Sequence, residues 1–405
     1  MRSIRAPFAR GRGRRAALAA TGLAAALALT ATACGPSDDS SSDKADSSSS
    51  QGADKGSDSG SDVKLPTDIA DKLKEHGIDV DKWADGGWKD FSKDKWMREA
   101  KDFVNPVIKD LWKPKRMADA KDPNKTLAAK DAPSDQDATD PEPQPVQAKA
   151  EKTPYHKNAA PVGKIFFDSP KGSMVCSGTV VKDPRHPGKS NLVWTAGHCV
   201  HEGKTGGWYR NITFVPAYND LGKSPEALQS ASPQEVAPYG QFWANWVSTS
   251  NEWINGGGPT GGEGAPYDYA VMHVQPEQQG GKSLEETVGA ALPVDFSAPA
   301  TKSVGSMGAW GYPQADPYNG ALMYKCIDRP GRLSLAPSLP SMYRIGCTMT
   351  GGSSGGGWFR VVDGKTKLVS NTSIGPADNT WLAGPQLGSG AQQVFDFMSK
   401  KYGGQ

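Results

Sequence analysis

Residues 155–405 of this 405-residue chain have the pattern of an all-β fold. Three observations predict it: short runs rich in β-branched and aromatic residues, turn residues between these runs, and no long helical period. The clearest runs are 162–167, 175–181 and 270–274, with glycine, proline, asparagine and aspartate between them. Many short strands separated by turns are typical of a β-sandwich or a β-barrel.

The chain is longer than one compact core usually needs, so we expect several regions. The predicted regions are an export signal over 1–33, a disordered Ser/Asp/Gly tether over 34–62, a small helical region over 63–117, a polar proline-containing linker over 118–154, and the β-domain over 155–405. At the end of the β-domain, Val394, Phe395 and Met398 are spaced as in an amphipathic helix. This spacing predicts a C-terminal helix over about 390–402.

The N-terminal segment has the composition of an export signal. Six arginines within the first fifteen residues precede an apolar Ala/Leu run over 16–31, which is too short for a lasting membrane span. The run ends at Ala31-Thr32-Ala33-Cys34, which resembles the lipid-attachment motif of bacterial lipoproteins. Two interpretations stay open here: lipidation of Cys34, which would anchor the protein to a membrane, or plain cleavage after Ala33.

The number of cysteines favours lipidation. The chain has five cysteines, and an odd thiol in an exported protein needs an explanation. If Cys34 carries lipid, the remaining four can form two disulfides in an oxidising compartment. These four are Cys176, Cys199, Cys326 and Cys347. We therefore predict an exported protein, either a cell-surface lipoprotein or a secreted one.

The regions between the signal and the β-domain differ in composition. Residues 35–62 are almost wholly polar and cannot bury enough apolar surface to fold. In 63–117, tryptophans and other apolar residues alternate with charges, and Phe103, Val107 and Leu111 follow a helical spacing. We interpret 63–117 either as a prosegment that packs on the β-domain or as a helical spacer.

Three short runs in the β-domain carry side chains that fit nucleophilic catalysis. The runs are Trp194-Thr-Ala-Gly-His-Cys199, Tyr267-Asp-Tyr-Ala-Val271 and Cys347-Thr-Met-Thr-Gly-Gly-Ser-Ser-Gly-Gly-Gly-Trp358. They supply His198, Asp268 and Ser354 in the chain order of a chymotrypsin-type catalytic triad. A serine hydroxyl needs an adjacent base, and a histidine oriented by a carboxylate can accept its proton. We assign Ser354 as nucleophile, His198 as general base and acid, and Asp268 as orienting carboxylate.

The glycines around Ser354 suit an oxyanion hole, because converging backbone amides require a tight turn. By motif position the donors are the amides of Gly352 and Ser354. Ser353 is an alternative nucleophile, although the two glycines that follow Ser354 favour the latter. Asp268 has an alternative role as a simple turn residue, but it stands at the head of an apolar strand.

A metal site at His198, His201 and Glu202 is the alternative chemistry for the histidine run. The spacing of these residues does not place two ligands on one helical face. We expect no metal and no other cofactor. The net charge of +2 gives no reason to expect nucleic acid as a partner.

Residues 160–400 resemble the chymotrypsin-fold (trypsin-like) serine endopeptidases, nearest the glutamyl endopeptidase branch of secreted bacterial enzymes. The motifs that carry the resemblance are Thr195–Cys199, Cys176–Val180, Gly308–Pro313, Leu368–Gly375 and the glycine loop around Ser354. The resemblance implies two antiparallel six-stranded Greek-key β-barrels, at about 160–295 and 300–390. It also implies a Cys176–Cys199 disulfide, and Cys326 is the expected partner of Cys347.

The resemblance further implies where a substrate would bind. The expected substrate-binding residues are Thr348, Met349, Thr350, Ser373, Ile374 and Gly375. Thr348 stands where trypsin-type enzymes have an aspartate, so cleavage after Arg or Lys is disfavoured. The histidine that glutamyl endopeptidases place near Thr372 is missing, so Glu specificity is not supported. Met349, Thr350 and Ile374 suggest a small or apolar preference.

Two departures from the family pattern affect the expected mechanism. Animal members have an aspartate just before the nucleophile that pairs with a newly cleaved N-terminus; Ser353 occupies that position here. Gly357 replaces the usual proline. The function implied is a serine endopeptidase that hydrolyses protein or peptide substrates through an acyl-enzyme. The alternatives are a catalytically inactive binding module of the same fold and an envelope scaffold lipoprotein.

Overall fold

The computed structural model describes residues 105, 107–123, 126–127, 139–278 and 280–403, all within the unit Ser61–Gln405. The predicted export signal, the lipidation of Cys34, the tether and most of the region over 63–117 lie outside the described residues. No helix in the described part of the chain has the length and apolar composition needed to cross a bilayer.

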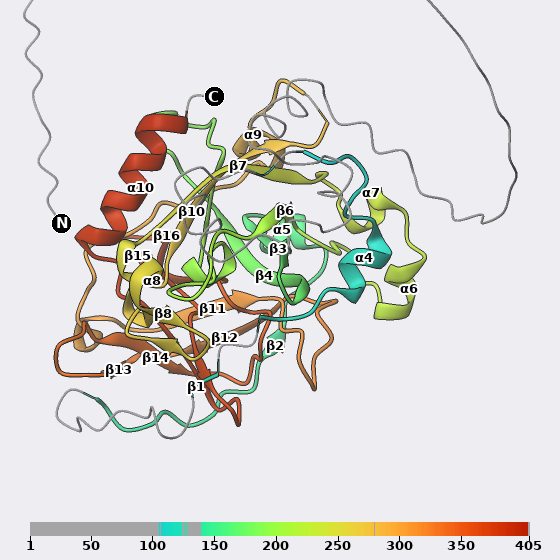
Figure 1. The fold of residues 1–405 in the computed structure, drawn as a ribbon. Helices are drawn as coiled ribbons and strands as arrows, with labels where there is room; N and C mark the ends of the chain where they lie inside the picture. Colours follow the sequence, from blue (N-terminus) through green and yellow to red (C-terminus); the bar gives the residue numbers. More distant parts are fainter. Residues whose placement is uncertain (1–104, 106, 124–125, 128–138, 279, 404–405) are drawn as a thin grey trace, which may run out of the picture. The chain divides into compact units, whose positions relative to one another are not determined.

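The first half of the β-domain is a closed antiparallel barrel (Figure 1). Its strands are β3 (Val162–Ser169), β4 (Gly172–Val181), β5 (Leu192–Thr195), β6 (Arg210–Pro216), β7 (Phe242–Thr249) and β10 (Ala270–Pro276). They follow the order β10-β5-β4-β3-β6-β7 around the barrel. Side chains alternate across each strand, so Ile165 and Phe167 enter one apolar cluster while Phe166 enters another. Both faces of β3 are therefore buried.

The second half of the β-domain forms two hydrogen-bonded sheets. One has the order β16-β15-β11-β12-β2 and the other the order β13-β14-β18. The strands are β2 (Lys149–Ala150), β11 (Met307–Gly311), β12 (Tyr324–Asp328), β13 (Gly331–Leu333), β14 (Met342–Gly346), β15 (Gly357–Val362), β16 (Lys365–Asn371) and β18 (Trp381–Gly384). Their side chains share one core that includes Ala309, Ile345 and Trp358.

Both predicted cysteine pairs are bonded in the structure. Cys176 joins β4 to Cys199 at the end of β5, and Cys326 on β12 joins Cys347 just after β14. The second disulfide links the two sheets of the second half, which share no hydrogen-bonded ladder between β12 and β14. A disulfide that closes a loop of about this length stabilises a fold by about 3 kcal/mol in the chain-entropy model.

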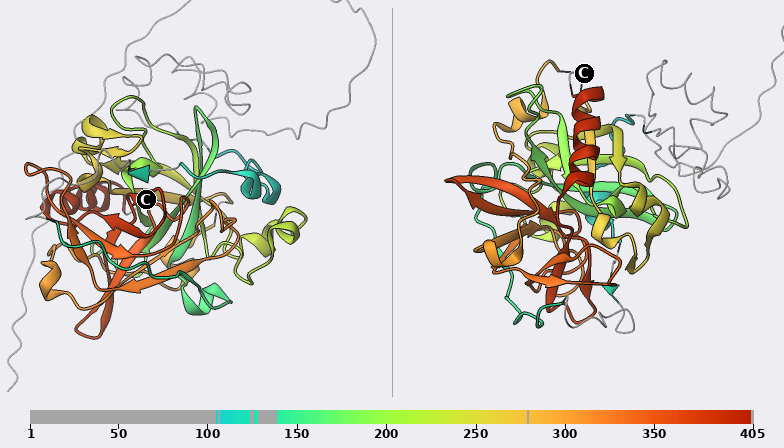
Figure 2. Two further views of the ribbon diagram at one scale, coloured as in Figure 1. Left: turned by 90° about the horizontal axis from the view of Figure 1, so that it is seen from below. Right: turned by 90° about the vertical axis from the view of Figure 1, so that its left-hand side faces the viewer.

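The helices are short, with one exception. They are α4 (Pro114–Asp119), α5 (Tyr155–Asn158), α6 (Pro225–Gln229), α7 (Pro233–Val236), α8 (Asn251–Gly256), α9 (Leu284–Val288), α10 (Ser389–Tyr402) and the 3₁₀ turns η3 (Gly197–Cys199), η4 (Ala265–Tyr267) and η5 (Thr301–Ser303). α10, in red in Figures 1 and 2, lies along β7 and β10 of the closed barrel. The all-β class and the C-terminal helix are thus confirmed, with the second half built of two sheets.

Asn105 and residues 107–123 cover part of the outer face of the closed barrel. Ile108, Trp112 and Met117 are buried in the cluster that contains Phe166. The Trp112 indole N–H donates to the Asn211 carbonyl at 2.7 Å. Arg116 forms a salt bridge with the buried Asp168 on β3 at 2.7 Å. Because β3 has apolar side chains on both faces, the barrel needs this cover.

The helical spacing around Phe103, Val107 and Leu111 does not produce a helix in its described part: residues 107–113 are irregular, and α4 begins only at Pro114. A proline at 106 disfavours helical geometry for Asn105. The Asn105 side chain instead bonds the backbone of Ile212 and Ala244, at 2.8–2.9 Å. The apolar residues here follow the barrel surface and not a helix period.

The end of the expected linker also contacts the β-domain. Asp140 pairs with Arg332 at 2.8 Å, and β2 extends the five-stranded sheet beside β12. Glu151, which is buried, forms a salt bridge with Lys325 at 2.8 Å. Residues 139–154 are therefore part of the second half of the domain where the structure describes them.

Replacement of Trp112 by alanine tests whether 105–123 belongs to the folded domain. Trp112 is 1% exposed, so the change should lower the free energy of unfolding by about 3–5 kcal/mol. Urea unfolding measures this, with Lys115→Ala as control, because Lys115 is exposed and its ion pair with Asp119 contributes little. A loss no larger than that of the control would show that the segment is not integral to the fold.

Candidate active site

His198 is held rigidly between β5 and the first disulfide. It lies in η3, and the next residue, Cys199, is bonded to Cys176 on β4. Gly197 precedes it, and a Cβ at that position would lie 2.6 Å from Thr249 Oγ1 and 2.8 Å from the Trp253 ring. This crowding explains why a residue without a side chain stands at position 197. The histidine side chain is fully buried.

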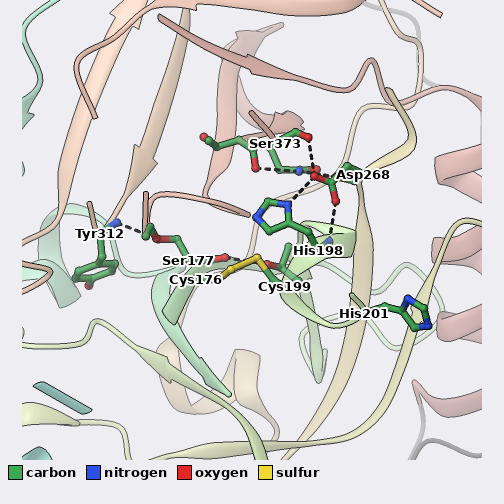
Figure 3. Close-up of a disulfide and its surroundings, with 12 residues drawn as sticks. Cys176, Ser177, His198, Cys199, His201, Asp268, Tyr312 and Ser373 are labelled. Carbon is green, nitrogen blue, oxygen red and sulfur yellow. Dashed lines mark hydrogen bonds and ion pairs between the residues drawn. A yellow bond between two sulfur atoms is a disulfide. The ribbon is translucent and has the colours of Figure 1, made fainter. Parts of the chain in front are cut away.

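Asp268 meets this histidine from the end of η4, just before β10. Its Oδ1 accepts the backbone N–H of His198 at 2.8 Å, and its Oδ2 lies 2.6 Å from His198 Nδ1. Ser373 Oγ donates to the same Oδ2 at 2.6 Å (Figure 3). The carboxylate is completely buried, so these three donors replace the water that it would otherwise bind.

The hydrogen-bond pattern fixes the role of each ring nitrogen. A carboxylate can only accept, so Nδ1 of His198 carries the proton in this pair. In the neutral ring Nε2 is then the free acceptor. Nε2 is buried and has no hydrogen-bond partner among the described residues, and no hydrogen bond joins it to Ser354 Oγ.

Ser354 lies in a loop that packs directly against the histidine segment. Its carbonyl accepts the Ser177 amide at 2.7 Å, and Ser177 neighbours Cys176 of the disulfide. A Cβ on Gly355 would lie 2.1 Å from Thr195 Oγ1, so only glycine allows this approach. Gly352 has a φ of +95°, which also favours glycine. The glycines here serve close packing and a tight turn.

Ser353 is turned into its own loop. Its hydroxyl is buried and donates to the Thr350 carbonyl at 2.7 Å. The backbone amides of Gly352 and Ser354 have no hydrogen-bond partner among the described residues. Both amides are therefore available as hydrogen-bond donors, which an oxyanion hole requires.

A small pocket beside Ser354 contains most of the residues expected to bind substrate. Its lining includes Met349, Thr350, Ser354, Ser373, Ile374 and Gly375. Thr348 does not line it. Its hydroxyl accepts the Ala148 amide at 2.9 Å and lies 3.0 Å from the Tyr318 hydroxyl. The segment before the β-domain thus uses the side chain that the family pattern places at the pocket base.

The chain itself pairs with the edge of this pocket. β1 (Thr126–Leu127) pairs in parallel with β17 (Gly375–Pro376). Upstream, Lys121 exchanges backbone hydrogen bonds with Ser173 and Val175 on either side of Met174 in β4. A Cβ on Gly351, at the pocket wall, would lie 2.2 Å from the Asp122 carboxylate. The segment therefore reaches the pocket from the barrel side and again at β17.

His201 does not join this site. Figure 3 shows its ring directed away from His198. Burial lowers the pKa of His201 to about 4, so the ring is neutral. Among the described residues, the one group close enough to hold a metal is Cys176, His198 and Cys199, and its two sulfurs are joined in the disulfide.

Two residues of the site lie in motifs that carry the resemblance but have no role predicted from the sequence. Asn371 donates through Nδ2 to the Asp268 carbonyl at 2.9 Å and accepts from the Trp194 indole at 3.0 Å. Ser177 bonds the glycine loop through both its backbone and its side chain. Each acts through hydrogen bonds to backbone groups distant in sequence, which no local pattern predicts.

Comparisons with known proteins give solved structures but no other match. A scan of protein-family models and a search of curated proteins find no significant relative. Among solved structures, a thermostable serine protease AL20 from an extremophilic microorganism has 32% sequence identity and a TM-score of 0.49, over 60% of this chain and 98% of that one. The protease Anisep from Arthrobacter nicotinovorans has 30% identity and a TM-score of 0.48, over 62% and 99% of the respective chains.

A Glu endopeptidase in complex with MPD has 15% identity and a TM-score of 0.45, over 64% of this chain and 99% of that one. A chain that shares 32% of its residues with AL20 across 98% of that protein is a relative of it. This chain therefore belongs to the chymotrypsin-fold (trypsin-like) serine proteases.

Proposed function

We propose that this protein is a serine endopeptidase that hydrolyses peptide bonds through an acyl-enzyme. The observation that carries the proposal is the fully buried His198–Asp268 pair, with Nδ1 and Oδ2 2.6 Å apart and Nε2 left as an acceptor. A buried histidine oriented in this way is the general base that a serine nucleophile needs. The glycine loop brings Ser354 to the same disulfide that holds His198.

The proposed reaction has two halves. Ser354 Oγ attacks the carbonyl carbon of the scissile bond while His198 Nε2 takes the hydroxyl proton. The oxyanion that forms accepts hydrogen bonds from the backbone amides of Gly352 and Ser354. His198 then gives the proton to the leaving amine, and the C–N bond breaks. A water molecule, activated by the same nitrogen, hydrolyses the acyl-enzyme and restores Ser354.

The pocket supports a small or apolar residue before the scissile bond. Met349, Thr350 and Ile374 contribute to its lining, and Met349 and Ile374 are almost fully buried. No acidic or basic side chain lines this pocket among the described residues. The two disulfides suit an oxidising compartment, in keeping with export. Lipidation of Cys34 and the resulting membrane anchor belong to the same proposal and rest on the sequence alone.

Labelling with a fluorophosphonate tests the nucleophile directly. We expect the wild-type protein to be labelled and Ser354→Ala to stay unlabelled, with a fall in peptide hydrolysis on the order of 10⁶-fold. Ser353→Ala serves as the matched control and should retain labelling. An unlabelled wild type would favour the inactive binding module. Equal labelling of the wild type and Ser354→Ala would show that Ser354 is not the nucleophile.

Substitution of Ser373 tests the role of the Asp268 carboxylate. Ser373→Ala removes a hydrogen bond to a buried charge, worth about 1.5–3 kcal/mol, and should lower kcat about tenfold or more. Ser370→Ala is the control, because Ser370 is equally buried but donates to the Pro385 carbonyl. Steady-state kinetics on a peptide substrate measure both, and equal kcat values in the two variants would contradict the assignment.

The β1–β17 pairing predicts competition between this segment and substrate. The segment Leu368–Gly375 resembles the strand that pairs with substrate backbone in this family, and Thr126 of β1 is paired with Gly375. A Thr126→Pro/Leu127→Pro double variant disrupts the backbone pairing of β1 and should lower KM about fivefold, if about 1 kcal/mol of pairing is lost. A Thr126→Val/Leu127→Val variant keeps the donors and should leave KM unchanged. Equal KM values in both would show that β1 does not compete.

A further inference from the structure

Two adjacent polar side chains of the closed barrel point toward the second half of the domain: Ser177 contacts the glycine loop, and Lys164 contacts Gln314 and Gly320 beside it. Lys164 on β3 and Ser177 on β4 are register partners across the two strands. Ser177 is completely buried and Lys164 is 1% exposed. The reaction proposed above does not use either side chain directly. Buried polar groups in such a position need an explanation, because their desolvation is unfavourable.

Ser177 holds the glycine loop at two points. Its Oγ donates to the Gly352 carbonyl at 3.0 Å and accepts the Tyr312 amide at 2.9 Å. Its own backbone amide donates to the Ser354 carbonyl at 2.7 Å. Figure 3 shows Ser177 between the disulfide and Tyr312. One residue thus contacts both residues whose amides would face the oxyanion.

The peptide that joins Gly351 to Gly352 is fixed from the opposite side. The backbone N–H of Gln314 donates to the Gly351 carbonyl at 2.6 Å. In a planar trans peptide the carbonyl and the following N–H point in opposite directions. The Gly351 carbonyl therefore sets the direction of the Gly352 N–H. A Cβ on Gly352 would lie 2.8 Å from the Gln314 amide nitrogen, so the two backbones are in direct contact.

Lys164 holds Gln314 in place. Its Nζ donates to Gln314 Oε1 at 3.2 Å and to the Gly320 carbonyl at 2.8 Å. It also lies over the Tyr218 ring, 4.9 Å from the centroid. No carboxylate forms a salt bridge with it among the described residues. A buried ammonium without a carboxylate partner does not favour stability, so it is retained at a stability cost.

We propose that Ser177 and Lys164 are positioning residues that aim the Gly352 amide at the oxyanion. The proposal rests on the proposed function, since it concerns the transition state of that reaction. Ser177 Oγ holds the carbonyl of Gly352. Lys164 holds the side chain of Gln314, whose backbone N–H in turn holds the carbonyl of Gly351. Together they prevent rotation of the two peptide planes that flank Gly352.

The burial of Lys164 predicts how its contribution to stability changes with pH. The titratable group in direct contact with Lys164 is Tyr218, whose ring in turn packs against Tyr312, and Tyr312 packs against Tyr155. Burial lowers the pKa of Lys164 to about 7 and raises the pKa values of the three phenols. Between about pH 7 and the unfolded lysine pKa of about 10.4, the unfolded chain binds the proton that the folded chain has lost, so this group makes stability rise with pH.

The test compares Ser177→Ala and Lys164→Met with Ser190→Ala. Ser190 is an equally buried serine of the barrel, and its hydroxyl donates to the Val181 carbonyl without contact to the glycine loop. Loss of an oxyanion donor lowers kcat by about 10²–10³-fold, so a misdirected amide should lower kcat by about 10- to 100-fold with KM within about twofold. Ser190→Ala should leave both values unchanged. Equal kcat values in all three variants would overturn the proposal.

Two further measurements distinguish failure of this positioning role from failure of the proposed protease function. Lys164→Met should unfold at a higher temperature than the wild type at pH 6, and the increase should be smaller at pH 10. Its kcat should nevertheless fall. A fall in both the unfolding temperature and kcat would indicate a merely structural role. Hydrogen exchange of a peptide that contains residues 348–358 does not depend on activity. It should be faster in Ser177→Ala and Lys164→Met than in the wild type and in Ser190→Ala. Unchanged exchange would overturn the positioning role of Ser177 and Lys164. This outcome can be read even if fluorophosphonate labelling shows that the protein is not a protease.

Discussion

The burial of the Asp268 carboxylate is the constraint on which the site depends. A fully desolvated charge is tolerated only when fixed donors surround it, and here they come from both halves of the β-domain. His198 supplies two donors from the end of β5, and Ser373 supplies a third from the segment after β16. The charge therefore links the two halves beside the proposed reacting groups. It also holds the imidazole in one orientation without any contact to substrate.

A second constraint comes from the closed barrel, whose strands carry apolar side chains on both faces. The interior fills itself, but the outer face needs cover from other segments. Residues 105–123 cover one part and α10 another, where the Tyr402 and Trp246 rings stack 4.8 Å apart. The segment before the β-domain is thus anchored by its own apolar residues. Its anchoring also explains how β1, further along the same segment, comes to lie at β17.

The sequence predicted the residues of the site better than their surroundings. His198, Asp268 and Ser373 sit in short motifs whose chemistry limits the choice of residue, and the structure brings these three together. The base of the pocket was predicted less well, because Thr348 is bonded by residue 148, about 200 positions earlier in the chain. The helical spacing around Val107 and Leu111 failed for a related reason. Apolar residues that follow a curved barrel surface can imitate a helix period, and a proline interrupts this one.

The glycine loop is held by hydrogen bonds between neutral groups at the place where animal relatives form an ion pair. Where animal relatives have an aspartate before the nucleophile, Ser353 donates to the Thr350 carbonyl within its own loop. The neighbouring carbonyls are held by Ser177 and by the Gln314 amide, which are neutral groups already present in the chain. A loop fixed by such bonds requires no newly cleaved N-terminus to acquire its shape. Control of the site would then act on access to the pocket edge, where β1 pairs with β17, and not on assembly of the oxyanion hole.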